Sequence, residues 1–323
     1  MIALRPGAGL VLAALIAAAP AWADTWPSRP LRLIVPFPPG GAADAVGRIY
    51  SEKLAEALRQ PVLIDNKPGA GSSIGGDLAA RAPADGYTLS LAPAGQLTVV
   101  PHLNKAIGYD PLKDFAPVTL LAQVAYVIAA QPSLPVNDLQ GLVRLAKAQP
   151  GKLTYSSCGN GTLCNLTGEL FKSAAGVDLL HVPYKGSAPA VSALLAGEVS
   201  LASDTLTILA PQVKAGKVKA LAITSPERSS LLPDVPTTAE VGYPQVLSVS
   251  WFGLVVPAAT PQAIVNRLSS ELTRISQQPE LRQRLAQLGL EALNCSPDRF
   301  AEVIRTDHAQ WGQIIQRAGI RGD

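Results

Sequence analysis

Short apolar runs alternate with segments of helical periodicity along most of the chain. The first run covers residues 31–35, and residues 45–58 repeat their apolar positions at spacings of three and four. Strands that alternate with helices predict a mainly parallel sheet with helices on both faces. Further strands are expected at 61–65, 87–92, 127–130, 153–156, 179–182, 199–202 and 220–224, and further helices at 74–81, 139–148, 163–175, 188–196 and 205–213.

The C-terminal part of the chain breaks this alternation. One more apolar strand is expected at residues 250–256, and three amphipathic helices with proline near their starts follow at 261–277, 279–288 and 297–318. These helices have no strands of their own to cover. We therefore expect them to pack back on the first part of the fold.

The length of the chain is enough for one large core or for two lobes. It has 323 residues, whereas single cores stop growing near roughly 250–300 residues. We expect the chain to cross between the lobes near residues 121–125 and 246–250. Lobe one would then hold residues 24–124 and 247–323, and lobe two residues 125–246.

The first 23 residues predict a signal peptide. Arg5 supplies a short positive region, residues 7–19 form an apolar region, and Ala21 and Ala23 are small residues where a signal peptidase reads the chain. Cleavage after Ala23 would export the protein to the periplasm, with Asp24 first. An N-terminal membrane anchor is the alternative. No later run of about 18 apolar residues predicts a transmembrane body.

Export would place the three cysteines in an oxidising compartment, where a disulfide can form. At most one internal disulfide can form among Cys158, Cys164 and Cys295. Cys158 and Cys164 are close in sequence and could close a small loop in an oxidising compartment. Three unpaired, largely buried thiols are the alternative.

Three loops of small residues each follow an expected strand, at residues 36–44, 66–73 and 156–162. Such loops lie at the carboxyl ends of strands, where open α/β sheets bind ligands. We expect positive φ angles at Gly40 and Gly41, where glycine also lets the backbone approach a ligand closely. Unpaired N–H groups at the following helix starts favour anions. Together the loops predict a site that holds a carboxylate through backbone amides and hydroxyls.

Little in the sequence predicts catalysis. Cys158 and His181 suggest a thiol hydrolase only superficially, because Cys158 lacks a nucleophile signature. The chain has no paired acid/base motif, and His102 and His308 lack metal-ligand spacing. We expect no catalytic residue, no metal and no cofactor. The net charge of +3 comes without a basic block, so nucleic acid is not expected as a partner.

Several stretches match a known family in order: WPSRP at 26–30, PFPPGGAAD at 36–44, NKPGAGS at 66–72, ADGYTL at 84–89, HVPYKG at 181–186, LPDVPTTAEVGYP at 232–244 and WFGLVVPAATP at 251–261. They resemble the Bug family, the TctC-like extracytoplasmic receptors of tripartite tricarboxylate transporters. The resemblance implies a type II periplasmic-binding-protein fold, with two α/β lobes, a central cleft and a two-stranded hinge.

The resemblance also implies a function. Such a protein would be a monomeric periplasmic receptor that captures a small carboxylate or related compound for the membrane components of its transporter. A secreted α/β hydrolytic enzyme and a ligand sensor for signalling are the alternatives. The implied ligand-binding residues are Phe37, Pro39, Gly40, Gly41, Asp44, Gly69, Ala70, Gln96, Ser156, Gly159, Gly161, Thr162 and Asp204.

A few positions carry two interpretations. Asp204 would accept a hydrogen bond from the ligand or cap the helix at 205–213, and Asp44 could cap the helix that follows it. Lys67 and Lys185 are expected to be solvated, whereas Trp251 and Phe252 are expected in the core or hinge. The sequence departs from the family at Leu163, Cys164 and Asn165, which replace a more polar stretch.

Overall fold

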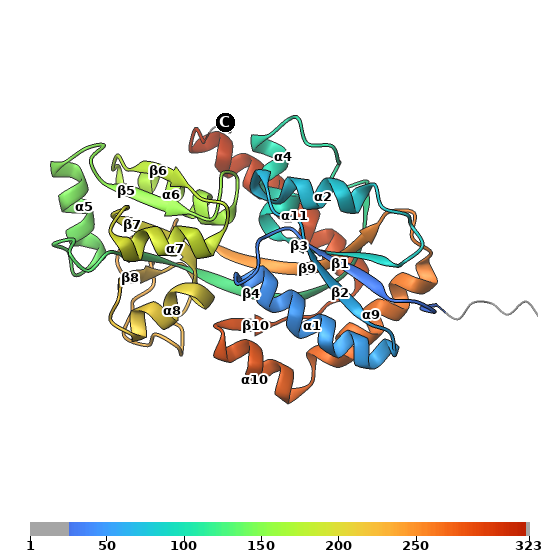
Figure 1. The fold of residues 1–323 in the computed structure, drawn as a ribbon. Coiled ribbons are helices and arrows are strands. Elements are labelled where there is room, and N and C mark those ends of the chain that lie inside the picture. Colours follow the sequence, from blue (N-terminus) through green and yellow to red (C-terminus); the bar gives the residue numbers. More distant parts are fainter. Residues whose placement is uncertain (1–25, 321–323) are drawn as a thin grey trace, which may run out of the picture.

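The chain folds into two α/β lobes that lie side by side (Figure 1). The computed structural model describes residues 26–320. The expected signal peptide and its cleavage site after Ala23 lie outside the described residues. Within residues 26–320, no helix combines the length and the apolar character that crossing a bilayer requires.

Lobe one is built on a mixed sheet with the strand order β2-β1-β3-β9-β4. Strand β1 pairs in parallel with β2 and β3, whereas β9 pairs antiparallel with β3 and β4. A short strand, β10, adds to β4. The strands are β1 (Leu31–Val35), β2 (Val62–Asn66), β3 (Thr88–Pro93), the first part of β4 (Phe115–Ala130), β9 (Val249–Pro257) and β10 (Leu290–Ala292).

Lobe two continues from the far end of β4. Its strands β5 and β6 are parallel, β5 is parallel to β7, and β4 pairs antiparallel with β7 and β8. These strands are β5 (Thr154–Ser157), β6 (Leu180–Pro183), β7 (Leu201–Thr205) and β8 (Lys219–Ile223). One long strand, β4, therefore belongs to the sheets of both lobes.

The expectation of a mainly parallel sheet is wrong at the centre of the molecule, where β4 and β9 run antiparallel. The reason is the connection between the lobes, because β4 carries the chain into lobe two and β9 begins its return through lobe one. Strands running in opposite directions pair without the crossover that parallel strands need. The outer strands of each lobe are linked through helices and are parallel, as the alternation predicts.

Strand β4 is much longer than the expected segment at 127–130. It has 16 residues and starts at Phe115. The sequence signal is weakened by Pro117, which has no N–H to give to a neighbouring strand. The register of β4 against β9 shifts between Pro117 and Thr119.

The helices cover both sheets. Each main helix falls close to its expected position, whereas the short η1, α3 and α4 and the strand β10 were not expected. The helices are α1 (Ala42–Leu58), η1 (Ala70–Ser72), α2 (Ser73–Ala80), α3 (Ala94–Thr98), α4 (Val100–Leu103), α5 (Leu139–Ala148), α6 (Leu163–Ala175), α7 (Ser187–Ala196), α8 (Leu206–Lys214), α9 (Gln262–Ser276), α10 (Pro279–Gln287) and α11 (Pro297–Arg317).

The C-terminal helices lie on lobe one, as expected, but the premise that they have no strand of their own is wrong, because the short β10 lies between α10 and α11 and packs against α10. Helix α9 packs against β4 and α1, and α11 packs against β4 and α3. The fully buried ring of Phe300 in α11 rests on Gly253 of β9, where any Cβ atom would displace it. This packing fixes β9, and with it the return path between the lobes.

Candidate ligand-binding cleft

Helix starts from both lobes converge on one pocket between them. In lobe one, β1 leads into α1, β2 into η1 and α2, and β3 into α3; in lobe two, β5, β6 and β7 lead into α6, α7 and α8. The first residues of α1, α3, α6 and α7, the last residues of η1, and Thr205 just before α8 line this inner pocket. The carboxyl ends of the strands in both sheets thus face the same space, where α/β proteins bind ligands.

The inner pocket has a cavity volume of about 50 Å³, and a neighbouring outer groove has about 420 Å³. The two share Phe37, Pro38, Gly71, Ser72 and Cys158, so they are parts of one cleft. None of the described residues that line the inner pocket has a charged side chain. Positive potential there comes from the helix starts, whose first N–H groups lack partners inside the helix.

The first loop is braced by Asp44 from the first turn of α1. Its Oδ2 accepts hydrogen bonds from the backbone N–H of Gly40 at 3.0 Å and from Nε of Arg48 at 2.8 Å. Burial would raise the pKa of Asp44, but the hydrogen bonds from Arg48, Gly40 and Asn66 outweigh it and hold that pKa below its usual value. Asp44 is therefore an ionised group that shapes the loop.

Asn66 ties the first loop to the second. Its Nδ2 donates to the carbonyl of Phe37 at 2.9 Å and to Oδ1 of Asp44 at 3.1 Å.

The expected positive φ is present at Gly40, at 92°, but the expectation is wrong for Gly41, whose φ is −91°. Gly41 is the extended residue just before α1, and it needs no left-handed conformation.

The second loop holds three successive left-handed residues. Ala70, Gly71 and Ser72 have φ angles of 46°, 62° and 84°. Such angles are unfavourable for residues with a Cβ atom, and residues that adopt them cluster at active sites and ligand-binding loops. Ser72 lines both parts of the cleft, and its buried Oγ has no hydrogen-bond partner among the described residues.

Gln96, in the first turn of α3, lines the inner pocket. Its side chain is completely buried, and neither Oε1 nor Nε2 has a hydrogen-bond partner among the described residues. Leaving a buried amide without partners is costly, so an amide in such a place is normally satisfied by a ligand or by water. Gln96 and Ser72 supply lobe one with free donors and acceptors at the cleft.

The third loop is closed by a disulfide between Cys158 and Cys164, whose Cα atoms are 5.8 Å apart. Both cysteines line the inner pocket, whereas Cys295 is a free, partly buried thiol packed against the core cluster that also contains Cys158 and Cys164. Thr162 caps α6 by accepting from the N–H of Asn165, and its hydroxyl donates to the carbonyl of Gly159. As a disulfide, Cys158 has no thiol for the nucleophile considered above.

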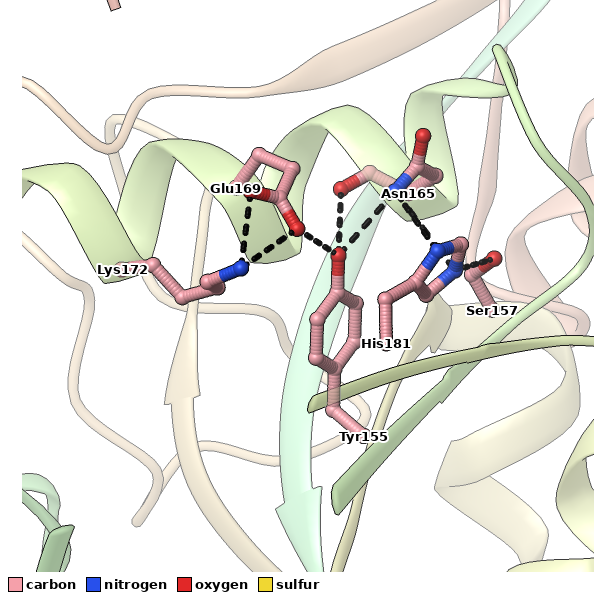
Figure 2. Close-up of polar contacts among 6 residues, drawn as sticks. All are labelled: Tyr155, Ser157, Asn165, Glu169, Lys172 and His181. Atoms are coloured by element: carbon pink, nitrogen blue, oxygen red, sulfur yellow. Dashed lines mark hydrogen bonds and ion pairs between the residues drawn. The ribbon is translucent and has the colours of Figure 1, made fainter. Parts of the chain in front are cut away.

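A chain of polar contacts lies beneath the third loop (Figure 2). His181 bonds to Oγ of Ser157 at 2.7 Å and stacks on the ring of Tyr155. Ser157 is fully buried and does not line either part of the cleft, so this serine–histidine pair has no access to a substrate. The chain runs through Lys172, Glu169, Tyr155, Asn165, His181 and Ser157.

Asn165 connects this chain to the cleft. Its Nδ2 donates to the hydroxyl of Tyr155 at 3.0 Å, and its Oδ1 accepts from the backbone N–H of Gly161 at 3.3 Å. Burial and the neighbouring carboxylate of Glu169 both raise the pKa of the Tyr155 hydroxyl, which therefore stays protonated and donates to Glu169. The third loop is thus held by side chains from β5, β6 and α6.

Asp204 lies just behind the wall of the pocket, at the end of β7. Its Oδ1 accepts from Oγ of Ser187 at 2.8 Å and from the N–H of Thr205 at 2.7 Å, whereas Oδ2 has no hydrogen-bond partner among the described residues. Burial raises the pKa of Asp204 to about 6, although these hydrogen bonds oppose the shift. A carboxylate oxygen of Asp204 and the sulfurs of the disulfide lie within 4.8 Å of one another.

The structure brings most of the implied site residues to the cleft. Those that line it are Phe37, Pro39, Gly41, Gln96 and Thr162 in the inner pocket and Gly69, Ala70, Gly159 and Gly161 in the outer groove. Those that do not line it are Gly40, Asp44, Ser156 and Asp204. Ser156 is buried, and its hydroxyl donates to the carbonyl of Ala190.

The sequence analysis missed other lining residues. Ser72, Ser187 and Thr205 stand near helix starts after strands, so the rule that identified the other loops could have found them. Tyr126, Ser250 and Phe252 come from the strands that connect the lobes, where no loop motif marks them. Phe252 is a core residue, as expected, and also part of the pocket wall.

The two lobes touch at the rim of the cleft. A Cβ atom built on Gly186 of lobe two would lie 2.9 Å from Cγ of Pro38 in lobe one, and one on Gly95 would lie 3.4 Å from the backbone nitrogen of Leu163. A Cβ atom built on Gly71 of lobe one would likewise meet the backbone carbonyl oxygen of Asn160 in lobe two. The cleft is therefore closed around the pocket in this structure.

Comparisons with known proteins agree with this arrangement. The model of a family described as the tripartite tricarboxylate transporter family receptor matches residues 46–320. Protein BugT of Bordetella pertussis is 35% identical over 314 residues, which cover 97% of this chain and 96% of BugT.

Two solved structures are also similar. The periplasmic binding protein BugD has a TM-score of 0.88 at 36% identity, covering 92% of this chain and 100% of BugD. An R. palustris protein solved with adipate has a TM-score of 0.89 at 34% identity, with the same two coverages of 92% and 100%.

Proposed function

Because the chain belongs to the tripartite tricarboxylate transporter receptor family, we propose that it is a periplasmic receptor that captures a small carboxylate between its lobes and catalyses no reaction. Its relatives include a periplasmic binding protein and a protein solved with adipate. The partners of this chain are then a small carboxylate and the membrane components of a tripartite transporter, and it acts as a monomer exported by cleavage after Ala23.

One observation carries the proposal. Helix starts from both lobes face one pocket, and none of the described residues that line this pocket has a charged side chain. Helices α1, α6, α7 and α8 each begin at the pocket wall or directly beside it. A carboxylate there accepts hydrogen bonds from backbone N–H groups and gains from the positive ends of the helix dipoles. Buried polar groups at Ser72 and Gln96 offer further contacts.

The site residues divide by role. Phe37, Gly41, Gln96 and Thr162 contact the ligand in the inner pocket, together with the other lining residues. Asp44 acts through the loop that it braces, since its oxygens bond to Gly40, Arg48 and Asn66. Gly40 and Ser156 likewise shape the cleft from behind its surface.

The two connections between the lobes provide a hinge about which the lobes can close on a ligand. Ala125 pairs with β9 in the sheet of lobe one, whereas Tyr126 pairs with β7 in lobe two, so β4 passes between the lobes at that point. The chain returns where Ser248 bonds to Thr224 and Val249 pairs with Ala125. These crossings lie within two residues of the expected limits of lobe two, residues 125–246, and the lobes rotate about these two segments.

A secreted hydrolytic enzyme is the competing function. The candidate nucleophiles with a histidine to pair with are Cys158, as considered from the sequence, and Ser157, which bonds to His181. The first is in a disulfide and the second is buried away from the cleft. Both observations favour a receptor.

Calorimetry tests the proposal. The purified protein is titrated with carboxylates of four to eight carbons, with one or two carboxyl groups, and with the matched primary amides. At least one carboxylate should bind, and its amide should not, because the amide lacks the charge that the helix starts favour. Equal binding of an acid and its amide, or no binding by any carboxylate, would overturn the proposal.

A further inference from the structure

Within this proposed function, we propose that the inner pocket selects monocarboxylates with an uncharged, apolar body and that Asp204 excludes dicarboxylates. The carboxylate of the ligand lies at the loops of lobe one, and the far end of the ligand points toward Ser187 and Thr205 in lobe two. The ligand class thus differs from that of the relative solved with adipate, which carries a carboxylate at each end.

The walls of the inner pocket suit a hydrocarbon or aromatic body. The disulfide Cys158–Cys164 also lies in the wall, and disulfide sulfur is apolar. Contact with such walls removes apolar ligand surface from water, which favours binding in proportion to the area covered. The apolar walls include Phe37, Pro38, Pro93, Tyr126, Leu163 and Phe252.

The pocket offers no cation to a second carboxylate. Among the described residues that line the cleft, the only charged side chain is that of Lys185, which is exposed in the outer groove. A carboxylate that leaves water without a cation or enough donors is strongly disfavoured. The helix starts of lobe one can hold one carboxylate. At the far end, the starts of α7 and α8 lie beside Asp204, and the hydroxyl of Ser187 and the N–H of Thr205 already donate to that carboxyl group.

Asp204 adds a repulsive element at that far end. It is completely buried, its Oδ2 has no hydrogen-bond partner among the described residues, and it contacts Ser187 and Thr205 in the pocket wall. The groups that donate hydrogen bonds to it, Ser187 and Thr205, are both neutral. A second carboxylate beside it would place two like charges in a poorly solvated space, which discriminates against such ligands.

The test compares ligands that differ only in the second carboxylate. Calorimetry at pH 8 measures the affinities of hexanoate and adipate, and of benzoate and terephthalate, with the full mature protein. The monocarboxylate of at least one pair should bind at least about tenfold more tightly than its dicarboxylate partner. Adipate or terephthalate binding as tightly as its partner would overturn the inference and leave the receptor function standing. No binding by any of the four would overturn the inference as stated.

A variant identifies the cause of the selectivity. Asp204→Asn keeps the shape of the side chain and removes its charge, so the ratio between monocarboxylate and dicarboxylate affinities should fall several-fold. Asp234→Asn removes the same charge from an exposed position of lobe two and should leave the ratio unchanged. An unchanged ratio in Asp204→Asn would contradict the role of Asp204. Lys185→Ala checks the remaining cation, and adipate binding that depends on Lys185 would contradict the inference. The wild-type ratio tests the ligand class even if a variant fails to fold.

Discussion

The backbone of Gly71 in lobe one lies directly against the carbonyl oxygen of Asn160 in lobe two, and no space remains between them for a Cβ atom. Gly71 also has a left-handed φ of 62°. The contact joins the second loop to the third at the rim of the outer groove. It depends on the lobes being together, so it reports on closure.

Gly71→Ala should therefore hinder closure. The Cβ atom should hold Asn160 away and weaken carboxylate binding at least about tenfold, and the left-handed backbone should cost roughly 1 kcal/mol of stability. Gly176→Ala is the matched control, because Gly176 has a φ of 60° with nothing within 4 Å of its added Cβ. The control should lose the same stability and keep its affinity. Equal affinities of the two variants in calorimetry would refute the closure contact.

The main chain of the first loop should matter more than nearby lysines. Gly41→Val adds a branched side chain to a residue that lines the inner pocket, so it should abolish carboxylate binding by occupying the ligand's space. Lys67 pairs with Asp65 at 3.1 Å and does not line the cleft, so Lys67→Ala should change the affinity less than about twofold. If Lys67→Ala removes binding and Gly41→Val retains it, side-chain charge holds the ligand instead.

The disulfide should leave one thiol in the mature protein. Labelling under denaturing, non-reducing conditions should find Cys295 alone, and labelling after reduction should find all three cysteines. Reduction should lower the free energy of unfolding by roughly 2 kcal/mol, because the unfolded chain regains the freedom of a short loop. Three reactive thiols before reduction would show that the bridge does not form.

Asp204 should make stability depend on pH. Its folded pKa of about 6 lies above the ordinary value of 3.8, so the folded state holds this proton more strongly. The stability that the protonated form contributes is complete below about pH 4 and is lost as the pH rises through 6. Asp204→Asn has no proton to lose at this position, so the variant does not lose this stability as the pH rises. The stability of the variant relative to wild type should therefore rise between pH 5 and pH 7.5 in denaturant melts, and an unchanged difference would contradict the burial of an ionisable Asp204.

Local patterns predicted most of the fold. The run at residues 31–35 is β1, and the periodic segments at 139–148 and 163–175 are α5 and α6, because strong periodicity and clear stops determine such elements locally. The pairing of β4 with β9 was not predictable in this way. It depends on residues more than a hundred positions apart and on how the two lobes are connected.

The candidate site, like the fold, has parts that local patterns predict and parts that depend on tertiary packing. Loops at strand ends placed Phe37, Gly41 and Thr162 at the cleft, because chain order alone brings those ends to one edge of a sheet. The contribution of Tyr126 from a connecting strand depends on how one lobe faces the other. The position of Asp204 behind the pocket wall likewise follows from tertiary packing, which no local motif encodes.

Solution scattering with and without ligand tests the central claim, that a carboxylate is held between two lobes that close on it. A ligand that contacts both lobes favours the closed state by the contacts it makes only there. Addition of a carboxylate that binds in calorimetry should lower the radius of gyration, whereas the matched amide should leave it unchanged. A tight carboxylate that leaves the radius of gyration of an open protein unchanged would contradict the account.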